Sequence, residues 1–175
     1  MDEFPAFFPH VKNSFMDGTQ RPVQRPKDGR NRKRCHSGKK KAHTRKNLVS
    51  SDENKTVLLL SPTKNGRVHD KKRMDKESWM EFIQPHLMCR FDEGFQGLQG
   101  PNVTRPKKKP KGTALTHEKK EQNRTISGIR MINEHAMAGI ERLCSTWHVY
   151  RNHKGRDDTF MLPASALRNF HLECT

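Results

Sequence analysis

Three acidic residues, Asp17, Asp92 and Glu134, stand far apart in the sequence but could share one metal-dependent site. Carboxylate oxygens are hard ligands, which favour Mg²⁺ or Mn²⁺ over zinc. Three such groups can hold two divalent cations about 3.5–4 Å apart. One cation would activate a water or a 3′-hydroxyl, and the other would stabilise the leaving oxygen of a phosphodiester. Metal-dependent phosphodiester chemistry is therefore the first hypothesis for this chain.

Each aspartate follows a short apolar segment that is typical of a β-strand. Residues 13–16 run into Asp17 and Gly18, and residues 87–91 run into Asp92 and a glycine-bearing loop. We expect both strands to end at their aspartates. For Asp17 the alternative is an ordinary Asp-Gly turn, which is common and has no catalytic role.

The third acid lies in a long amphipathic segment. Between residues 118 and 150, apolar residues recur at three- and four-residue spacing, which predicts one helix with a single packing stripe. Glu134 points roughly 160° away from Ala136 around that helix, so it is free of the packing stripe. The alternative is a solvated glutamate that pairs with Arg130 one turn earlier. The stripe consists of Ile129, Ile132, Ala136, Ile140, Leu143 and Trp147.

The net charge of the chain indicates a polyanionic partner. Its 175 residues carry 35 Lys and Arg against 19 Asp and Glu, a formal net charge of +16, and 31% of them are hydrophobic. This length suits one domain with a small core, and the excess of cations is typical of nucleic-acid binding. A basic chain that is merely soluble is the alternative, but here the cations are clustered.

Two basic segments predict contacts with a DNA backbone. Residues 21–41 are rich in Lys and Arg and are broken by Pro22 and Pro26, and residues 105–112 form a second basic loop. Neither segment can bury its charges, so phosphate contact is the expected role. A disordered basic linker is the alternative for the first segment. The cations expected to hold DNA are Lys39, Lys40, Lys41, Lys107, Lys108, Lys109 and Arg130.

The remaining segments predict an α/β fold. Residues 43–61 indicate an antiparallel hairpin around a polar turn, and residues 71–83 indicate a helix that Asp70 caps. Residues 160–172 indicate a short closing helix that Pro163 interrupts. The four cysteines are far apart, so they predict neither a disulfide framework nor a zinc site, and a reducing compartment fits best. No signal peptide or membrane span is expected, because the longest apolar run covers only residues 56–60.

Several short blocks, each weak alone, are specific together because of their order along nearly the whole chain. They consist of Met16 to Thr19, Arg21 to Pro26, Ser37 to Lys41, His43, Thr44, Lys46, Asn47, His69, Asp70, Asp92, Gly94 to Gly97, Pro106 to Gly112, Asn123, Ile126, Ser127, Arg130, Glu134 to Ala136, Gly139 and Arg168 to Phe170. With these blocks the chain resembles the catalytic part of DDE-superfamily transposases of bacterial insertion sequences, which are relatives of the eukaryotic Harbinger elements.

The resemblance implies a ribonuclease-H-like mixed sheet with flanking helices, in which Asp17, Asp92 and Glu134 form the acidic triad and hold two Mg²⁺ or Mn²⁺ ions. It implies a metal-dependent endonuclease that cleaves and transfers strands of double-stranded DNA during insertion-sequence transposition. Residues 1–12 would be an N-terminal arm and residues 13–172 the catalytic domain. The expected location is the cytoplasm, at the bacterial nucleoid and away from membranes.

The chain departs from the family pattern at several positions. Gln20 stands where the family often has Glu, Asn133 replaces a usual apolar residue, Glu141 stands where the family tends to be basic, and Ala166 replaces a usual Gly. Only 16 residues precede Asp17, whereas the family normally has DNA-binding helices there. We therefore expect a downstream piece of a split or decayed transposase, working with an upstream DNA-binding segment or as a homodimer.

Two other classes of function compete with the nuclease. A catalytically inactive remnant would act only as a basic nucleic-acid-binding protein, and composition cannot separate it from the enzyme because both need the charge. A zinc-based scaffold has little support, since the ten histidines and four cysteines are not at ligand spacing. His135 could contact a phosphate beside Glu134, but a histidine at such a position more often packs.

Overall fold

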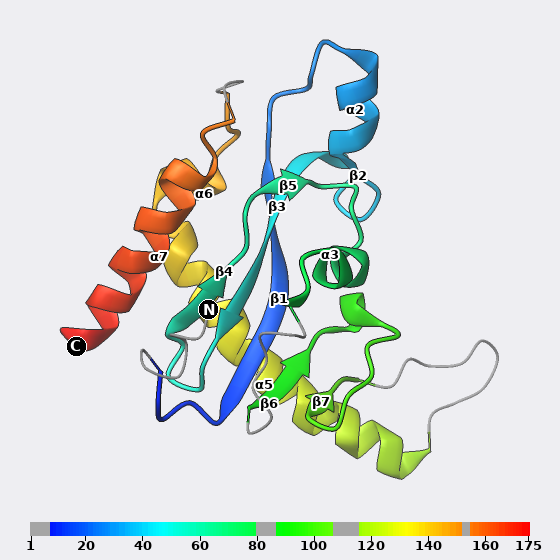
Figure 1. The fold of residues 1–175 in the computed structure, drawn as a ribbon, viewed down its shortest axis with the longest axis vertical. Coiled ribbons are helices and arrows are strands. Elements are labelled where there is room, and N and C mark those ends of the chain that lie inside the picture. Colours follow the sequence, from blue (N-terminus) through cyan, green and yellow to red (C-terminus); the bar gives the residue numbers. More distant parts are fainter. Residues whose placement is uncertain (1–7, 80–86, 107–115, 152–154) are drawn as a thin grey trace.

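The structure of the protein is a computed structural model, which describes residues 8–79, 87–106, 116–151 and 155–175. Most strands lie in the first half of the chain, and the last three elements are helices (Figure 1). In sequence order the elements are β1 (Asn13–Pro22), α2 (Gly29–Cys35), β2 (His36–Ser37), β3 (Ala42–Ser51), β4 (Val57–Leu60), β5 (Lys64–Asn65), α3 (Asp70–Lys76), β6 (Met88–Phe91), η1 (Glu93–Phe95), β7 (Val103–Thr104), α5 (His117–Glu141), α6 (Cys144–Trp147) and α7 (Asp158–Glu173).

A mixed sheet forms the centre of the molecule. In the described part of the chain the strand order is β2-β3-β1-β6-β7, and β4 and β5 also pair with β3. Strand β1 pairs antiparallel with β3 and parallel with β6, so it joins the hairpin half of the sheet to the parallel half. This arrangement confirms the prediction of a mixed α/β fold with flanking helices, and it is consistent with a ribonuclease-H-like fold.

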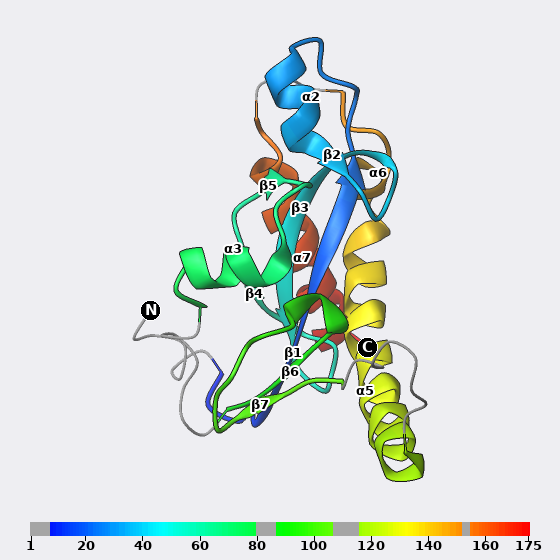
Figure 2. The ribbon, with the colours of Figure 1, turned by 90° about the vertical axis from the view of Figure 1, so that its right-hand side faces the viewer.

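Helices cover both faces of this sheet (Figure 2). On one face, Met74 of α3 packs with Met16 of β1, Leu48 of β3 and Phe91 of β6. On the other face, α5 and α7 pack against β3 and β4, and this cluster consists of Val49, Val57, Ile140, Met161 and Ala164. Because side chains alternate along a strand, neighbouring residues such as Leu48 and Val49 enter different cores. We call the two sides of the sheet the α3 face and the α5 face.

The hairpin prediction is confirmed, but the predicted end of the first strand is wrong. Strands β3 and β4 pair antiparallel. Strand β1 does not stop at Asp17, because its pairing with β3 continues from Asp17↔Val49 to Pro22↔Thr44. The long partner β3 supplies hydrogen bonds through the Asp-Gly step, so Asp17 lies in the middle of a strand instead of at a turn.

The long helix is shorter than its apolar pattern predicts. Helix α5 ends at Glu141, and Leu143 takes an extended conformation before the short α6. The buried hydroxyl of Thr146 donates hydrogen bonds to the carbonyls of Ile140 (3.0 Å) and Leu143 (2.7 Å). These carbonyls at the C-terminal end of α5 thereby gain a hydrogen-bond donor. The extrapolation of the packing stripe past Glu141 was therefore wrong, and Leu143 and Trp147 are exposed.

Two smaller predictions are also corrected. His69, not Asp70, is the N-cap residue of α3, and no side chain caps that helix. The closing helix α7 runs through Pro163 without interruption. Among the helices that the structure describes, none has the length and apolar character needed to cross a membrane.

Candidate active site

Asp17 and Asp92 lie next to each other across two neighbouring parallel strands. The register of β1 and β6 aligns Met16 with Phe91, and both side chains are buried on the α3 face. Asp17 and Asp92 each follow directly, and Asp92 keeps an extended backbone with φ −75° and ψ 170°. By strand alternation, we expect both carboxylates to be directed to the α5 face.

Helix α5 crosses this face of the sheet close to Asp17. The hydroxyl of Ser51 on β3 donates a 2.8 Å hydrogen bond to Asn133 Oδ1, and the hydroxyl of Thr19 on β1 donates a 3.1 Å bond to Glu141 Oε1. Ser51 pairs with Phe15 in the β1–β3 ladder, so the two contacts bracket Asp17 along β1. The helix thus passes over the strand segment that carries the first aspartate.

Glu134 lies on the side of α5 that carries Glu141, whose side chain reaches β1. It is separated from Met137 and Glu141 by three and seven residues, which places the three side chains along one side of the helix. Glu141 reaches Thr19 of β1, whereas Asn133 reaches Ser51 of β3. Glu134 itself is exposed, in agreement with its expected position off the packing stripe.

The three carboxylates do not form a compact metal cluster in the structure. Within the described ranges, no group of three or more His, Cys, Asp or Glu side chains is arranged to hold a metal ion. Strand pairing brings Asp17 and Asp92 together, and Glu134 lies on the helix that faces them. The acidic triad therefore stays a prediction.

Asp70 is a carboxylate near the site whose position the sequence did not reveal. Its Oδ1 lies 2.8 Å from the ammonium of Lys46, which is itself buried on β3. A methyl group on Gly18 would lie 2.8 Å from Asp70 Oδ1, and one on Gly94 would lie 3.1 Å from Asp70 Oδ2. The only signal in the sequence was a glycine one or two residues after each aspartate, at Gly18 and Gly94.

The first basic segment forms an arm beyond the end of β1 (Figure 1). This basic arm, residues 23–41, contains α2, whose first turn Asp28 caps through a 2.7 Å bond from Asn31 N. The prediction of a loop or a disordered linker is therefore wrong for residues 29–37, which form α2 and β2. Lys39, Lys40 and Lys41 are exposed between β2 and β3. Lys107, Lys108 and Lys109 lie outside the described residues, and Arg130 lies on α5 at a position whose side chain is not described.

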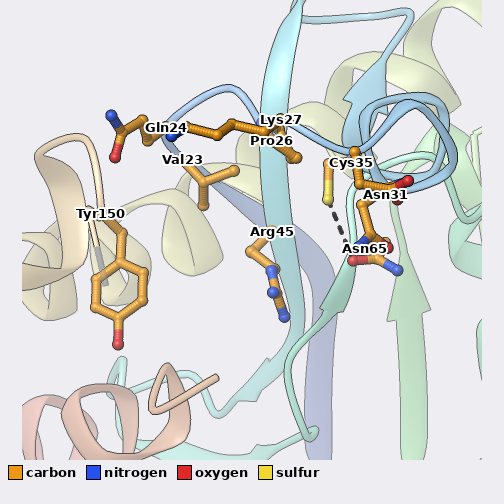
Figure 3. Close-up of a pocket in the computed structure, with 10 residues that line it drawn as sticks. Val23, Gln24, Pro26, Lys27, Asn31, Cys35, Arg45, Asn65 and Tyr150 are labelled. Carbon is orange, nitrogen blue, oxygen red and sulfur yellow. Dashed lines mark hydrogen bonds between the residues drawn. The ribbon is translucent and has the colours of Figure 1, made fainter. Parts of the chain in front are cut away.

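A cleft of ≈ 440 Å³ opens at the base of the basic arm (Figure 3). Lys27 of the arm, Arg45 of β3 and the ring of Tyr150 contribute to its walls. Cys35 at the end of α2 donates a 3.3 Å hydrogen bond to Asn65 Oδ1, which ties the arm to β5. The cleft therefore combines cationic, amide and aromatic groups.

A buried charge network anchors the strand end next to this cleft. Arg21 Nη2 lies 3.6 Å from Asp157 Oδ1 and donates a 2.9 Å hydrogen bond to Asn47 Oδ1. Burial lowers the pKa of Arg21, and the nearby Asp157 opposes that shift. Burial and Asp157 both raise the pKa of Tyr150. Arg21 and Asn47 carry the family resemblance, and in the structure their role is to hold β1, β3 and α7 together.

The chain is similar to a family of endonucleases and to a curated transposase. The sequence profile of a family described as "DDE superfamily endonuclease" matches residues 16–161. The chain is 35% identical over 144 residues to a protein of Microchaete diplosiphon described as "Probable transposase for insertion sequence element IS702". That match covers 81% of this chain and 50% of the relative, so the chain spans about half the length of the curated relative. No solved structure matches the chain.

Proposed function

Because the chain belongs to the DDE superfamily endonucleases, we propose that it carries the catalytic centre of an insertion-sequence transposase. In this proposal Asp17, Asp92 and Glu134 hold two Mg²⁺ or Mn²⁺ ions, and the substrate is double-stranded DNA at the transposon ends and at the target. The observation that supports the proposal is the register of β1 and β6, whose last pair, Met16 and Phe91, directly precedes Asp17 and Asp92.

The residues present fit hard divalent cations. The donor set consists of carboxylate oxygens, which Mg²⁺ and Mn²⁺ prefer. Gly18 directly after Asp17 and Gly94 two residues after Asp92 leave room for the carboxylate of Asp70. When bound, two such ions would activate the attacking oxygen and stabilise the leaving oxygen of a phosphodiester. The protein's own part is to hold the carboxylates and to bring the DNA backbone to them.

The basic arm supports the proposed DNA substrate. Arg30, Lys33 and Arg34 on α2 are exposed, as are Lys39, Lys40 and Lys41 between β2 and β3. A surface of this kind neutralises phosphates and attracts DNA without reading its sequence. Selection of transposon ends would then require another DNA-binding segment or a second copy of the chain.

A plasmid-nicking assay tests the proposal. Supercoiled plasmid is incubated with the protein, with and without Mg²⁺, and wild type is compared with Asp17→Asn, Asp92→Asn and Glu134→Gln. Asp75→Asn is the matched control, because Asp75 is an exposed carboxylate on α3 that pairs with Lys71. We expect Mg²⁺-dependent nicking that the control retains. Each triad variant should lose more than the roughly 10–100-fold that removal of an outer-shell partner costs a metal site.

A second candidate function is the inactive remnant that only binds nucleic acid. It is favoured by the lack of a compact metal cluster among the described residues. Under this alternative the protein binds plasmid in a salt-dependent manner, while Mg²⁺ causes neither cleavage nor a change in thermal stability. Nicking that persists in EDTA, or that the Asp92→Asn variant retains, would contradict the metal-dependent nuclease.

A further inference from the structure

The carboxylate of Asp70 lies close to a glycine in each of the two segments that carry the paired aspartates. Its Oδ1 is directed at Gly18, which follows Asp17, and its Oδ2 is directed at Gly94, two residues after Asp92. A Cβ atom at either glycine would lie closer to the carboxylate than ordinary packing allows. The side chain of Asp70 therefore fills the space between the two segments.

The carboxylate of Asp70 is held in place by a buried cation. Lys46 Nζ lies 2.8 Å from Asp70 Oδ1 and donates a hydrogen bond to the carbonyl of Val68 at 3.2 Å. The side chain of Lys46 is only 5% exposed and that of Asp70 is 18% exposed. In such a poorly hydrated position, neither charge can leave its partner without a cost in free energy.

The helix that carries Asp70 is itself fixed to the sheet. Arg73 is buried and donates hydrogen bonds to the carbonyl of Lys46 (2.7 Å) and to the hydroxyl of Ser61 (2.6 Å). Met74 packs in the core of the α3 face. Helix α3 therefore cannot shift along the sheet without breaking these contacts, and Asp70 at its first turn has little freedom.

We propose that Asp70 is a positioning residue that braces the two aspartate-bearing segments from the α3 face. The inference rests on the proposed function only in taking Asp17 and Asp92 as the metal-binding pair. The carboxylates of that pair are directed to the α5 face, whereas Gly18 presents its open side to Asp70. The brace thus acts through the backbone of β1 and of the turn after β6.

Hydrogen exchange tests the brace independently of any activity. Asp70→Asn keeps the shape of the side chain but removes the charge that Lys46 holds, and Asp75→Asn removes an exposed carboxylate from the same helix. We expect Asp70→Asn to raise exchange in residues 16–20 and 91–96 by on the order of 10-fold, the size expected when a charged contact is lost. Exchange in β4 and α7 should not change, and Asp75→Asn should match wild type throughout.

The response to Mg²⁺ tests positioning. We expect the Mg²⁺-induced rise in melting temperature to shrink in Asp70→Asn, and the rate of plasmid nicking to fall by roughly 100-fold, as for a misplacement of about 1 Å. Asp70→Glu should not restore either signal, because a longer side chain would push against Gly18 and Gly94. Asp75→Asn should again behave as wild type.

A second pair of variants examines the contact at Gly18 itself. Gly18→Ala should impair the Mg²⁺ response, because its new methyl group would meet a carboxylate that Lys46 holds in place. In a background of Asp70→Ala the same substitution should add little further loss, since the obstructing carboxylate is absent. Additive effects of the two substitutions would overturn the brace.

The outcomes separate the two proposals. If Asp70→Asn leaves exchange in both segments unchanged, the brace is wrong. If exchange rises but the Mg²⁺ response of the variant equals that of wild type, Asp70 is structural and the positioning role is wrong. If exchange rises in the variant while wild type itself shows neither Mg²⁺ stabilisation nor nicking, the brace stands and the proposed nuclease function falls.

Discussion

The hydroxyl of Ser51 donates a 2.8 Å hydrogen bond to Asn133 Oδ1, which joins the last residue of β3 to the helix position directly before Glu134. Both side chains are buried, so neither can exchange this bond for water. The bond also explains how an amide is accommodated where the family resemblance leads one to expect an apolar residue. The bond fixes the position of α5 relative to the sheet directly beside Glu134.

Asn133→Ala should therefore destabilise the protein and loosen α5. Loss of the bond leaves the buried Ser51 hydroxyl without this acceptor, and we expect the free energy of unfolding to fall by about 1–3 kcal/mol. Urea denaturation followed by circular dichroism measures the change. Asn31→Ala is the control, because Asn31 is exposed on α2 and its side chain should matter little. Equal stability of the two variants would show that the bond does not hold the helix.

The side-chain amide of Asn169 hydrogen-bonds the backbone of β4 as a neighbouring strand would. Its Oδ1 accepts a 2.8 Å hydrogen bond from Val57 N, and its Nδ2 donates a 2.8 Å bond to Val57 O. Asn169→Ala should lower the free energy of unfolding by about 1–3 kcal/mol, because both backbone groups of Val57 lose a partner. Leu167→Ala on the same helix removes an exposed side chain and should change stability by less than about 0.5 kcal/mol. Thermal melts of the two variants would decide the matter, and similar melting temperatures would contradict the prediction.

The cysteines should divide into two pairs of different reactivity. Cys35 and Cys89 are buried, and Cys144 and Cys174 are exposed. In the native protein a thiol reagent such as DTNB should therefore label Cys144 and Cys174 within minutes, while Cys35 and Cys89 react only on unfolding. The single variants Cys144→Ser and Cys174→Ser show which thiol accounts for each part of the fast DTNB reaction. Rapid labelling of Cys89 in the folded state would contradict its position in the core.

Cys89 also predicts a loss of stability at high pH. Burial raises the pKa of its thiol from 9.0 to about 12, with Ser14 opposing the shift weakly. Below pH 9 the thiol is neutral in both states and contributes no pH dependence. Between pH 9 and 12 the unfolded thiol ionises while the folded thiol keeps its proton, so rising pH favours unfolding. Urea titrations at pH 8, 9 and 10 should show this decline, and Cys89→Ala should show a shallower one. An identical slope in the variant would assign the decline to other groups, such as Tyr150, whose pKa is also raised.

The basic arm should supply a measurable share of the salt dependence of DNA binding. Lys39→Gln combined with Lys40→Gln removes two exposed cations, so the slope of log K against log[salt] should become shallower by up to about 2. Lys12→Gln combined with Lys55→Gln is the matched control, because the pairing of Phe15 with Ser51 places both lysines at the opposite end of β1. Fluorescence anisotropy with a labelled duplex measures the slopes. Equal slopes for the two double variants would remove the arm from the DNA interface.

The sequence located the strands that precede the two aspartates better than it located the ends of the elements. Apolar runs before Asp17 and Asp92 are local signals, and they marked β1 and β6 correctly. Whether β1 continues past Asp17 depends on β3, which pairs with it residue by residue as far as Pro22. That pairing joins segments far apart in the chain, so no local pattern reveals it.

The role of Asp70 was hidden for a similar reason. In the sequence, an aspartate before a basic helical segment is typical of an N-cap, and such a cap is the commoner role. In the structure, Lys46 on β3 draws the carboxylate to the sheet, and the two glycines leave room for it. Each of these partners lies on a different element, and only the folded chain brings them together.

The parallel pairing of β1 with β6 also determines when the carboxylate pair can come into existence. A nascent chain that has left the ribosome only as far as β4 already exposes the basic arm and Asp17, but it has no strand to set beside β1 on that edge. Asp92 and Glu134 arrive later in synthesis. Under the proposed function, the cationic surface is therefore synthesised before the carboxylate pair can form.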